Sequence, residues 1–476
     1  MNRKMIIYTL GRMLISEGLL LLLPAITGLI YKEIKVALSF LFVALITALI
    51  GYACSYKKPR KMKIYSKEGF VIAALAWTVL SLFGALPFYI SGEIPSYIDA
   101  IFETVSGFTT TGSSILVDVE ALSHASLFWR SFSHWIGGMG VLVFVVAILP
   151  EENGSTLHIL RAEMPGPIVG KLVSKLKATA QILYKIYIVL TIMEFIILMC
   201  CGMPVFDSLL HTFGTAGTGG FGIKGASIAY YDSAMIDAVI TIFMFLFGVN
   251  FNLYYFALLK QFGNIFKNEE LKWYTGIVLG AAILISLNTI SLYGDFLTAF
   301  RYASFQVVSV VTTTGYITAD YGCWPMFSQA ILFILMFMGA SAGSTGGGMK
   351  VSRIMIGVKN AIKEIKQLIH PQSVSCIKMD GDIVEDVTVR NISAYFVIYF
   401  LILFGSFLIV ALDNMDFAST LSSVVTCLNN VGPGFNIVGP VGNFSSLSDL
   451  SKIVLSFDML VGRLELFPFM VLFMKK

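Results

Sequence analysis

The feature that most constrains this chain is a short turn containing glycine, which recurs four times between a short apolar segment and a long one. The first copy reads Thr-Thr-Thr-Gly at residues 109–112 and follows the apolar helical pattern of residues 100–108. This short helix cannot cross a bilayer, because a membrane-spanning helix needs about 20 apolar residues. A short helix, a turn and then a long helix is typical of a re-entrant loop.

Three later stretches repeat this layout, and their turns are Thr218-Gly219-Gly220, Thr312-Thr313-Thr314-Gly315 and Asn429-Asn430-Val431-Gly432. The spacing of about one hundred residues is too long for a solenoid repeat and fits four membrane modules. The alternative is four unrelated turns between helices. That alternative does not explain their placement at membrane depth, where non-helical backbone is tolerated only against protein or a water-filled cavity.

The composition indicates an integral membrane protein. Of the 476 residues, 57% are hydrophobic and 13% are charged, whereas a soluble domain has about 25% charged residues. The net charge of +4 gives no indication of nucleic-acid binding. The six cysteines form no C-x-x-C pattern, and no H-E-x-x-H or Ser/His/Asp grouping has usable spacing. We therefore predict neither a metal centre nor an enzyme.

The order of apolar and basic stretches predicts the topology. Two spans, near residues 6–30 and 36–54, precede the first module, and the basic loop at 57–67 marks the cytoplasmic side. Each module then has an outward span, a loop and an inward span, so ten crossings place both termini in the cytoplasm. The expected inward spans are 127–149, 234–259, 327–338 and 453–473.

The predicted fold is an all-α polytopic membrane protein with four repeats around one pore and two extra N-terminal transmembrane helices. The expected segments are 1–67 (the two extra helices and the basic loop), 68–180, 181–271, 272–390 and 391–476. The segment 272–390 also holds a glycine-rich stretch and a long polar linker.

The four turns have the chemistry of a cation filter. A cation that crosses a membrane must exchange its hydration shell for protein oxygens, and rings of backbone carbonyls do this for potassium. Such a ring needs glycine where φ is positive, and a β-branched threonine beside it stiffens the turn. One Thr-Thr-Gly tripeptide is a weak signal, because it occurs by chance. Four copies, each after a short apolar helix and before a full span, are a strong signal.

These residues carry a resemblance to a known family. Over essentially its whole length the chain resembles the TrkH/TrkG branch of the Trk/Ktr/HKT superfamily of potassium transporters, which fold four M1–P–M2 modules around one pore. The resemblance implies a filter that consists of Thr110, Thr111, Gly112, Thr218, Gly219, Gly220, Thr313, Thr314, Gly315, Asn430, Val431 and Gly432. The second and fourth turns depart from Thr-Thr-Gly, but both departures resemble the TrkH pattern.

The first filter glycine bears on selectivity. Family members with serine at that position tend to admit sodium, so the resemblance and Gly112 together favour potassium as the transported ion. The alternative is a sodium-permeable or non-selective channel or symporter of the same fold.

The glycine-rich stretch from Gly339 to Lys350 interrupts the third inward span, because so much glycine breaks a helix. Close helix packing through Gly339-x-x-x-Gly343 is one interpretation. A phosphate-binding loop is a poor one, since no Gly-Lys-Ser/Thr follows and no strand precedes. The resemblance implies an intramembrane gate below the filter, and its residues are Gly343, Gly346, Gly347, Gly348 and Lys350. The alternative role of Lys350 is to anchor its helix in the lipid head groups.

Arg463 lies within the last span, where a charge is costly and indicates a functional role with a partner. Its candidate partners are Glu465 and the backbone carbonyls of the glycine-rich stretch, and a snorkelling arginine is the plainer alternative. The resemblance implies a gating arginine whose charge opposes a resting cation. We also expect Glu103 and His211 to anchor their short helices by hydrogen bonds, and the segment 134–140 to serve close helix packing.

The resemblance also implies partners and a location. The partners are the transported potassium ion, a second copy of the chain with one pore in each subunit, and a cytosolic nucleotide-binding ring of the TrkA type. The basic loops at 151–180, 260–272 and 350–390 offer a surface for that ring. Because this chain has no nucleotide motif of its own, nucleotide regulation would have to come from another polypeptide. The expected location is a bacterial inner membrane. A symporter for an organic solute is the competing class, but such folds often have inverted repeats, whereas these four modules all run in the same direction.

Overall fold

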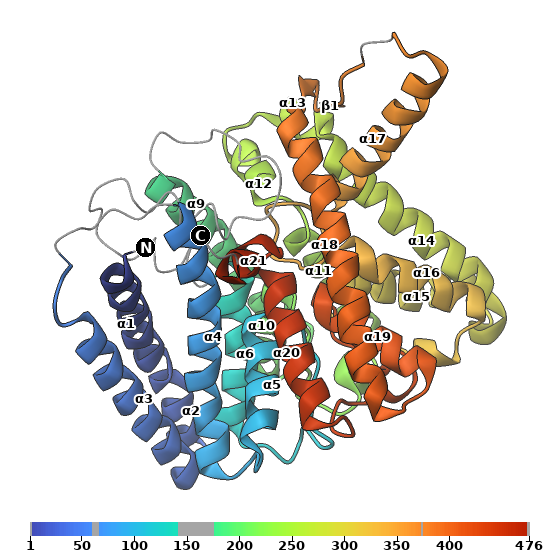
Figure 1. Ribbon diagram of the computed structural model, residues 1–476. Helices are drawn as coiled ribbons and strands as arrows, with labels where there is room; N and C mark the ends of the chain where they lie inside the picture. The colour runs from blue at the N-terminus through green and yellow to red at the C-terminus, as the bar shows by residue number, and fades with distance from the viewer. Residues whose placement is uncertain (1, 60–65, 141–175, 373–374, 474–476) are drawn as a thin grey trace.

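The computed structural model describes residues 2–59, 66–140, 176–372 and 375–473, and these residues are almost entirely helical (Figure 1). The two strands among them, β1 (Lys378–Met379) and β2 (Asp382–Ile383), form a small antiparallel hairpin. The predicted all-α class is therefore confirmed. Three predicted features lie outside the described residues: the basic residues at 60–65, the end of the first inward span at 141–149, and the basic loop up to residue 175.

The two extra N-terminal spans are present as predicted. Helix α1 (Arg3–Leu20) continues as α2 (Leu22–Ile30), and α3 (Ile34–Ser55) runs back along them. Small residues let the helices approach closely. A Cβ added at Gly11 would lie 2.7 Å from the Gly51 carbonyl oxygen.

Each repeat begins with a long apolar helix. These four helices are α4 (Ser66–Ser91), α9 (Leu176–Cys200), α14 (Glu269–Tyr293) and α18 (Asp386–Val410). With the two N-terminal spans, six helices in the described ranges are long and apolar enough to cross a membrane. The four helices predicted as the first span of each repeat are therefore present, and their outward direction stays a prediction.

A shorter helix follows each of these spans. The four short helices are α5 (Tyr97–Phe108), α10 (Val205–Gly217), α15 (Phe296–Val311) and α19 (Phe417–Asn429). Side-chain caps fix the start of three of them, because Ser96, Asp295 and Asp416 each accept a hydrogen bond from a backbone N–H in the first turn. Each short helix packs on the long helix of its own repeat and ends at one of the four predicted turns.

The second helix is broken in the second, third and fourth repeats, where its first part is α11 (Ala234–Phe247), α16 (Met326–Met338) and α20 (Asp449–Arg463), respectively. In the first repeat the second helix is α6 (His124–Gly138), which ends just before the described range does. Only α16 was expected to end at a glycine-rich stretch. The prediction of continuous helices at 234–259 and 453–473 is wrong, since α11 meets α12 (Phe251–Leu258) at 91° and α20 is separated from α21 (Phe467–Phe473).

Both unexpected breaks have local causes. Asn250 starts α12 by accepting a hydrogen bond from the Asn252 N–H, so the chain turns after Gly248. In the last repeat Glu465 and Leu466 have φ values of 59° and 67°, which a right-handed α-helix does not accommodate. Apolar residues continue through both breaks and conceal them in the sequence.

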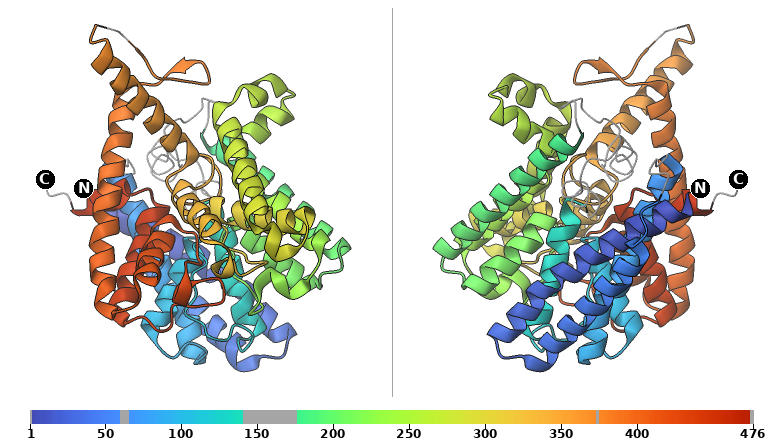
Figure 2. Two further views of the ribbon diagram at one scale, coloured as in Figure 1. Left: turned by 90° about the vertical axis from the view of Figure 1, so that its right-hand side faces the viewer. Right: turned by 90° about the vertical axis from the view of Figure 1, so that its left-hand side faces the viewer.

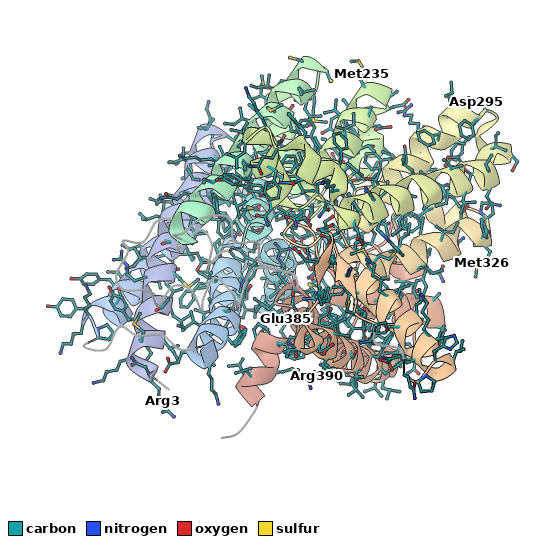
Figure 3. All side chains as sticks on the ribbon, turned by 90° about the horizontal axis from the view of Figure 1, so that it is seen from above. Arg3, Met235, Asp295, Met326, Glu385 and Arg390 are labelled. Carbon is teal, nitrogen blue, oxygen red and sulfur yellow. The ribbon has the colours of Figure 1, made fainter. Side chains whose placement is uncertain are left out.

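The repeats surround a common centre when the molecule is viewed from above (Figure 3), and the N-terminal helices lie outside them. Helix α17 (Val351–Ile369) follows the glycine-rich stretch and rises beside α18 to the hairpin (Figure 2). Both chain ends lie close together on one side of the molecule. The remaining elements are α13 (Phe262–Lys267) and the short 3-10 helices η1 (Ser227–Tyr231), η2 (Tyr321–Cys323), η3 (Ala411–Asp413) and η4 (Asn436–Val438).

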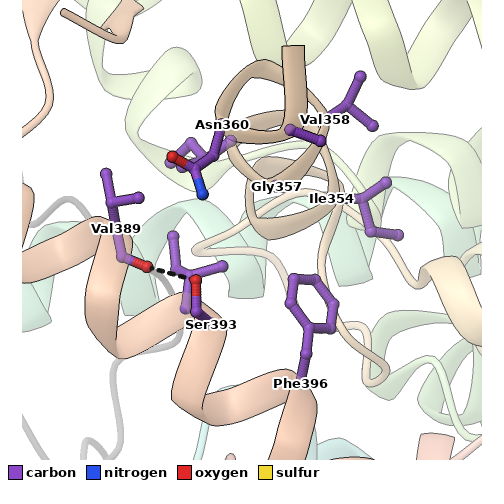
Figure 4. A pocket seen from close by; sticks show the side chains of 10 residues that line it. Ile354, Gly357, Val358, Asn360, Val389, Ser393 and Phe396 are labelled. Carbon is purple, nitrogen blue, oxygen red and sulfur yellow. Dashed lines mark hydrogen bonds between the residues drawn. The ribbon is translucent and has the colours of Figure 1, made fainter. Parts of the chain in front are cut away.

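A pocket of about 380 Å³ lies between α17 and α18 and is lined mainly by apolar side chains (Figure 4). Phe396 of α18 faces Gly357 of α17, where an added Cβ would lie 3.2 Å from the ring. Ser393 bonds its own helix through the Val389 carbonyl oxygen, 3.2 Å away. The pocket therefore belongs to the seam between these two helices and is separate from the four turns.

Candidate functional site

The four turns share one backbone conformation. The residue two positions before each key glycine is left-handed, with φ of 56° at Thr110, 54° at Thr218, 59° at Thr313 and 57° at Asn430. The glycines themselves have φ of 82° at Gly112, 69° at Gly220, 83° at Gly315 and 99° at Gly432. A left-handed threonine is uncommon, so the repetition indicates a shared structural requirement.

The four turns also share their hydrogen bonds. The residue before each glycine donates its N–H to a carbonyl five positions earlier in the short helix. The four pairs are Thr111 to Ser106 at 2.9 Å, Gly219 to Gly214 at 2.8 Å, Thr314 to Ser309 at 2.8 Å, and Val431 to Thr426 at 2.9 Å. These bonds fix each turn to the end of its helix.

The four turns meet in a closed ring. A Cβ added at each key glycine would collide with the carbonyl oxygen of a residue in the next turn. The pairs are Gly112 with Gly219, Gly220 with Thr314, Gly315 with Val431, and Gly432 with Thr111, the last at 2.7 Å. The sequence of contacts returns to its start, so the four carbonyl oxygens surround one axis. Only glycine fits at these four positions, and all twelve predicted filter residues belong to these four turns.

His134 of α6 connects two of the turns. Its Nδ1 lies 2.7 Å from the Gly107 carbonyl oxygen, and its Nε2 lies 3.3 Å from the Phe221 backbone nitrogen. These two partners require a neutral ring that donates from Nδ1 and accepts at Nε2. The prediction that segment 134–140 serves packing alone is therefore incomplete. A lone histidine in an apolar helix gave no sign of this bridging role.

Glu103 and His211, which were expected to anchor their short helices by hydrogen bonds, both bond residues outside those helices. The Glu103 carboxylate pairs with the Arg130 guanidinium at 2.7 Å, and it also accepts the Ile115 N–H at 3.0 Å. Both side chains of this pair are almost fully buried. His211 contacts the hydroxyls of Tyr316 at 3.3 Å and Tyr231 at 3.2 Å. The sequence analysis missed Arg130, although a single arginine in an apolar helix is a usable signal.

The glycine-rich stretch forms a buried loop against the ring, which we call the glycine loop (residues 339–350). The Gly347 N–H donates to the Thr313 hydroxyl at 2.7 Å. A Cβ added at Gly347 would lie 2.7 Å from the Asn429 carbonyl oxygen, and one at Gly346 would lie 3.0 Å from that of Thr312. The loop therefore contacts the helix-side ends of the third and fourth turns.

Arg463 bonds a backbone carbonyl of the glycine loop, which was one of its two predicted kinds of partner. Its Nη1 donates to the Thr345 carbonyl oxygen at 2.7 Å, and its Nη2 donates to the Gly138 carbonyl oxygen at 2.9 Å. The other candidate partner, Glu465, instead forms an ion pair with Arg353 of α17. The alternative prediction that Arg463 pairs with Glu465 is therefore wrong.

Lys350 lies at the end of the glycine loop and is 2% exposed. Its Nζ donates to the Gly346 carbonyl oxygen within the same loop. The alternative interpretation, an anchor in the lipid head groups, is contradicted by this burial. Gly343 and Gly348, two further predicted gate residues, adopt positive φ of 71° each.

The ring contains only backbone carbonyls, hydroxyls and amides. Among the residues that the structure describes, no group of three or more His, Cys, Asp and Glu side chains could hold a metal ion. The six cysteines are free. The ring therefore presents neutral oxygens around its axis.

Comparisons with known proteins cover the whole chain. The family model for TrkH, a cation transport protein, matches residues 34–294 and 295–476. The Trk system potassium uptake protein TrkH of Salmonella typhimurium is 37% identical over 480 residues, which covers 99% of both chains. The TrkG protein of Escherichia coli K12 is 34% identical over 96% of this chain and 94% of its own. The crystal structure of the potassium transporter TrkH from Vibrio parahaemolyticus matches with a TM-score of 0.89 and 33% identity, over 100% of this chain and 99% of that one.

Proposed function

The chain belongs to the TrkH family of cation transport proteins, which are membrane transporters and not enzymes, and from that premise we propose that it takes up potassium through the ring of four turns. The observation that carries this proposal is the closed ring of carbonyl oxygens at Thr111, Gly219, Thr314 and Val431. Such a ring can replace the hydration shell of a potassium ion.

The rigidity of the ring supports selectivity for potassium. Each turn is bonded back to its own helix, and each glycine contacts the carbonyl of the next turn, so the opening cannot contract without moving all four turns. A smaller ion such as sodium would then be held at too few oxygens. Gly112 supports the same choice, because a side chain there would displace the Gly219 carbonyl.

The glycine loop is the proposed gate. It lies against two of the four turns, and Arg463 places a positive charge beside it. A cation that leaves the ring toward this side meets both the loop and the charge, and both oppose its passage. Opening would require the loop to leave the ring and the hydrogen bond of Arg463 to Thr345 to break.

The proposal extends to partners and location. We place the protein in a bacterial inner membrane with both termini in the cytoplasm, as a homodimer that a cytosolic nucleotide-binding ring of the TrkA type regulates. Helix α17 and the β1–β2 hairpin support this arrangement, because α17 extends above the other helices (Figure 2) and Lys366 of α17 and Lys378 of the hairpin are exposed.

The test is uptake of radioactive rubidium into proteoliposomes that contain the purified protein, with potassium and sodium as competitors. The expected result is efficient competition by potassium and weak competition by sodium. Equal competition would favour a non-selective pore of the same fold. No uptake, even after deletion of Gly346–Gly348 to remove the gate, would contradict conduction through the ring.

A further inference from the structure

Glu270, in the first turn of α14, connects the two ends of the glycine loop. Its Oε1 accepts hydrogen bonds from the Ala342 N–H at 2.7 Å and from the Ser352 N–H at 3.1 Å. The side chain is 2% exposed. One carboxylate oxygen thus bonds the loop soon after it leaves α16 and again where α17 begins.

The same end of α14 is fixed from the other side by the β-hairpin. Asp380, at the tip of the hairpin, accepts the Glu269 N–H at 2.6 Å and a bond from the Asn268 side chain at 2.9 Å. Lys359 of α17 forms an ion pair with the Glu269 carboxylate. The hairpin and α17 therefore determine where the first turn of α14 lies, and that turn carries Glu270.

Two cations lie near Glu270. Lys350 and Arg353, at the end of the loop and the start of α17, are the cations that interact with it. One turn further along α14, the Tyr274 hydroxyl donates to the Phe245 carbonyl oxygen at 3.2 Å, beside the break between α11 and α12. One face of α14 thus contacts the glycine loop and the adjacent helix break.

We infer that Glu270 is a positioning residue that holds the glycine loop against the ring. The β1–β2 hairpin, on the side of the molecule proposed to face the regulatory partner, sets the position of Glu270. This inference rests on the glycine loop being the gate. Charge-assisted hydrogen bonds to the two loop ends are stronger than neutral ones. The loop must break at least one of them to move away from the ring, so a shift of the hairpin and α14 biases the gate.

A purely structural role makes a different prediction. If Glu270 only satisfies two buried N–H groups, its loss lowers stability but leaves the closed gate as tight as before. If Glu270 positions the loop, its loss raises the basal flux of folded protein while ion competition stays unchanged, because the ring is not touched. Flux and competition therefore separate the two roles.

The experiment measures rubidium flux in proteoliposomes without any partner protein, for wild type, Glu270→Leu, Glu270→Gln, Glu364→Gln and Arg463→Ala. We expect Glu270→Leu to raise basal flux about tenfold, a typical size for coupling between sites. Glu270→Gln should raise it less, since the amide oxygen still accepts both bonds. Glu364→Gln is the matched control, because Glu364 is exposed on α17, and it should behave as wild type.

The outcomes separate this inference from the proposed gate. If Arg463→Ala raises flux and Glu270→Leu does not, the gate stands and the role of Glu270 is overturned. If neither variant raises flux, the gate itself is wrong and the inference falls with it. Should Glu270→Leu not purify as a folded protein, hydrogen exchange of the peptide covering 339–352 in Glu270→Gln decides. Faster exchange than in wild type supports the positioning role, and equal exchange overturns it.

Discussion

The Arg463 guanidinium donates a hydrogen bond of 2.7 Å to the Thr345 carbonyl oxygen, so a side chain of the fourth repeat holds the loop of the third. The same group reaches the Gly138 carbonyl oxygen at the end of α6, in the first repeat. Segments of the first, third and fourth repeats therefore meet at this residue. Movement of the glycine loop would therefore be transmitted through Arg463 to the rest of the ring.

Replacing Arg463 should open the pore. In Arg463→Ala the loop loses its bond at Thr345, and the positive charge beside the path disappears, so basal rubidium flux should rise about tenfold. Arg463→Lys should raise it less, because an ammonium keeps the charge but lacks the planar fork that reaches both carbonyls. Arg390→Ala is the control, since that arginine is exposed on α18. Unchanged flux in Arg463→Ala would count against the gate.

Replacing Gly112 should weaken discrimination against sodium. The Cβ of Gly112→Ser collides with the Gly219 carbonyl, and the positive φ of 82° adds strain. The displaced carbonyl leaves the ring imperfect, and we expect the potassium preference to fall about tenfold, equivalent to about 1.4 kcal/mol. Competition of sodium against rubidium uptake measures it. Gly280→Ser is matched, because nothing lies within 4 Å of an added Cβ there; a similar loss in that control would refute the explanation.

The Glu103–Arg130 pair should matter more for folding than any exposed pair. Both side chains are buried, so Arg130→Met leaves the Glu103 carboxylate without its partner, which costs about 3–5 kcal/mol. Thermal unfolding in detergent should show a large decrease in Tm. The double variant Glu103→Leu with Arg130→Met should recover part of it. The exposed pair Lys224–Glu120 offers the comparison, and Lys224→Met should change Tm little.

The positions of the four turns were predictable because glycine at positive φ and the short apolar helix before it both leave a mark in the sequence. The long first helices were predictable from their length and hydropathy. The left-handed threonines were not, since threonine rarely adopts that conformation. Their conformation follows from the shared bonds between each turn and its helix, which only the folded repeat provides.

The contacts around the loop were the least predictable part. Arg463 has one acidic neighbour in sequence, Glu465, but the turn at residues 465 and 466 directs that carboxylate to Arg353. Glu270 bonds the Ala342 amide, which lies 72 residues later in the same repeat. Such long-range pairing depends on how the helices pack, and a single sequence with uniformly apolar helices contains little of that information. The breaks after Gly248 and Arg463 were concealed for the same reason.

The Asp416 cap of α19 should make the stability of the protein depend on pH only in the acid range. Hydrogen bonds from the Ser419 hydroxyl and backbone lower the pKa of Asp416 below its ordinary 3.8. Because the folded pKa is depressed, the contribution of the cap is complete above pH 3.8 and is lost as pH falls through the lowered value. Asp416→Asn keeps a capping oxygen without titrating. Its Tm should lie slightly below that of wild type near neutral pH and approach it in acid, because only wild type loses the contribution of the carboxylate, and parallel curves would contradict the assignment.

His134→Phe should disturb the first two turns together. The substitution keeps an aromatic ring against Phe221, whose centroid lies 4.2 Å away, but removes both ring nitrogens. The Phe221 N–H then loses its acceptor, which costs about 1–3 kcal/mol, and the Gly107 carbonyl keeps only its backbone bonds, such as that from the Thr110 N–H at 3.1 Å. We expect a lower Tm and stronger sodium competition, because both groups adjoin the ring. His124→Phe controls for the loss of an imidazole, since His124 is 42% exposed at its side chain and stacks on Tyr31. If His134→Phe keeps wild-type Tm and competition, His134 serves packing alone.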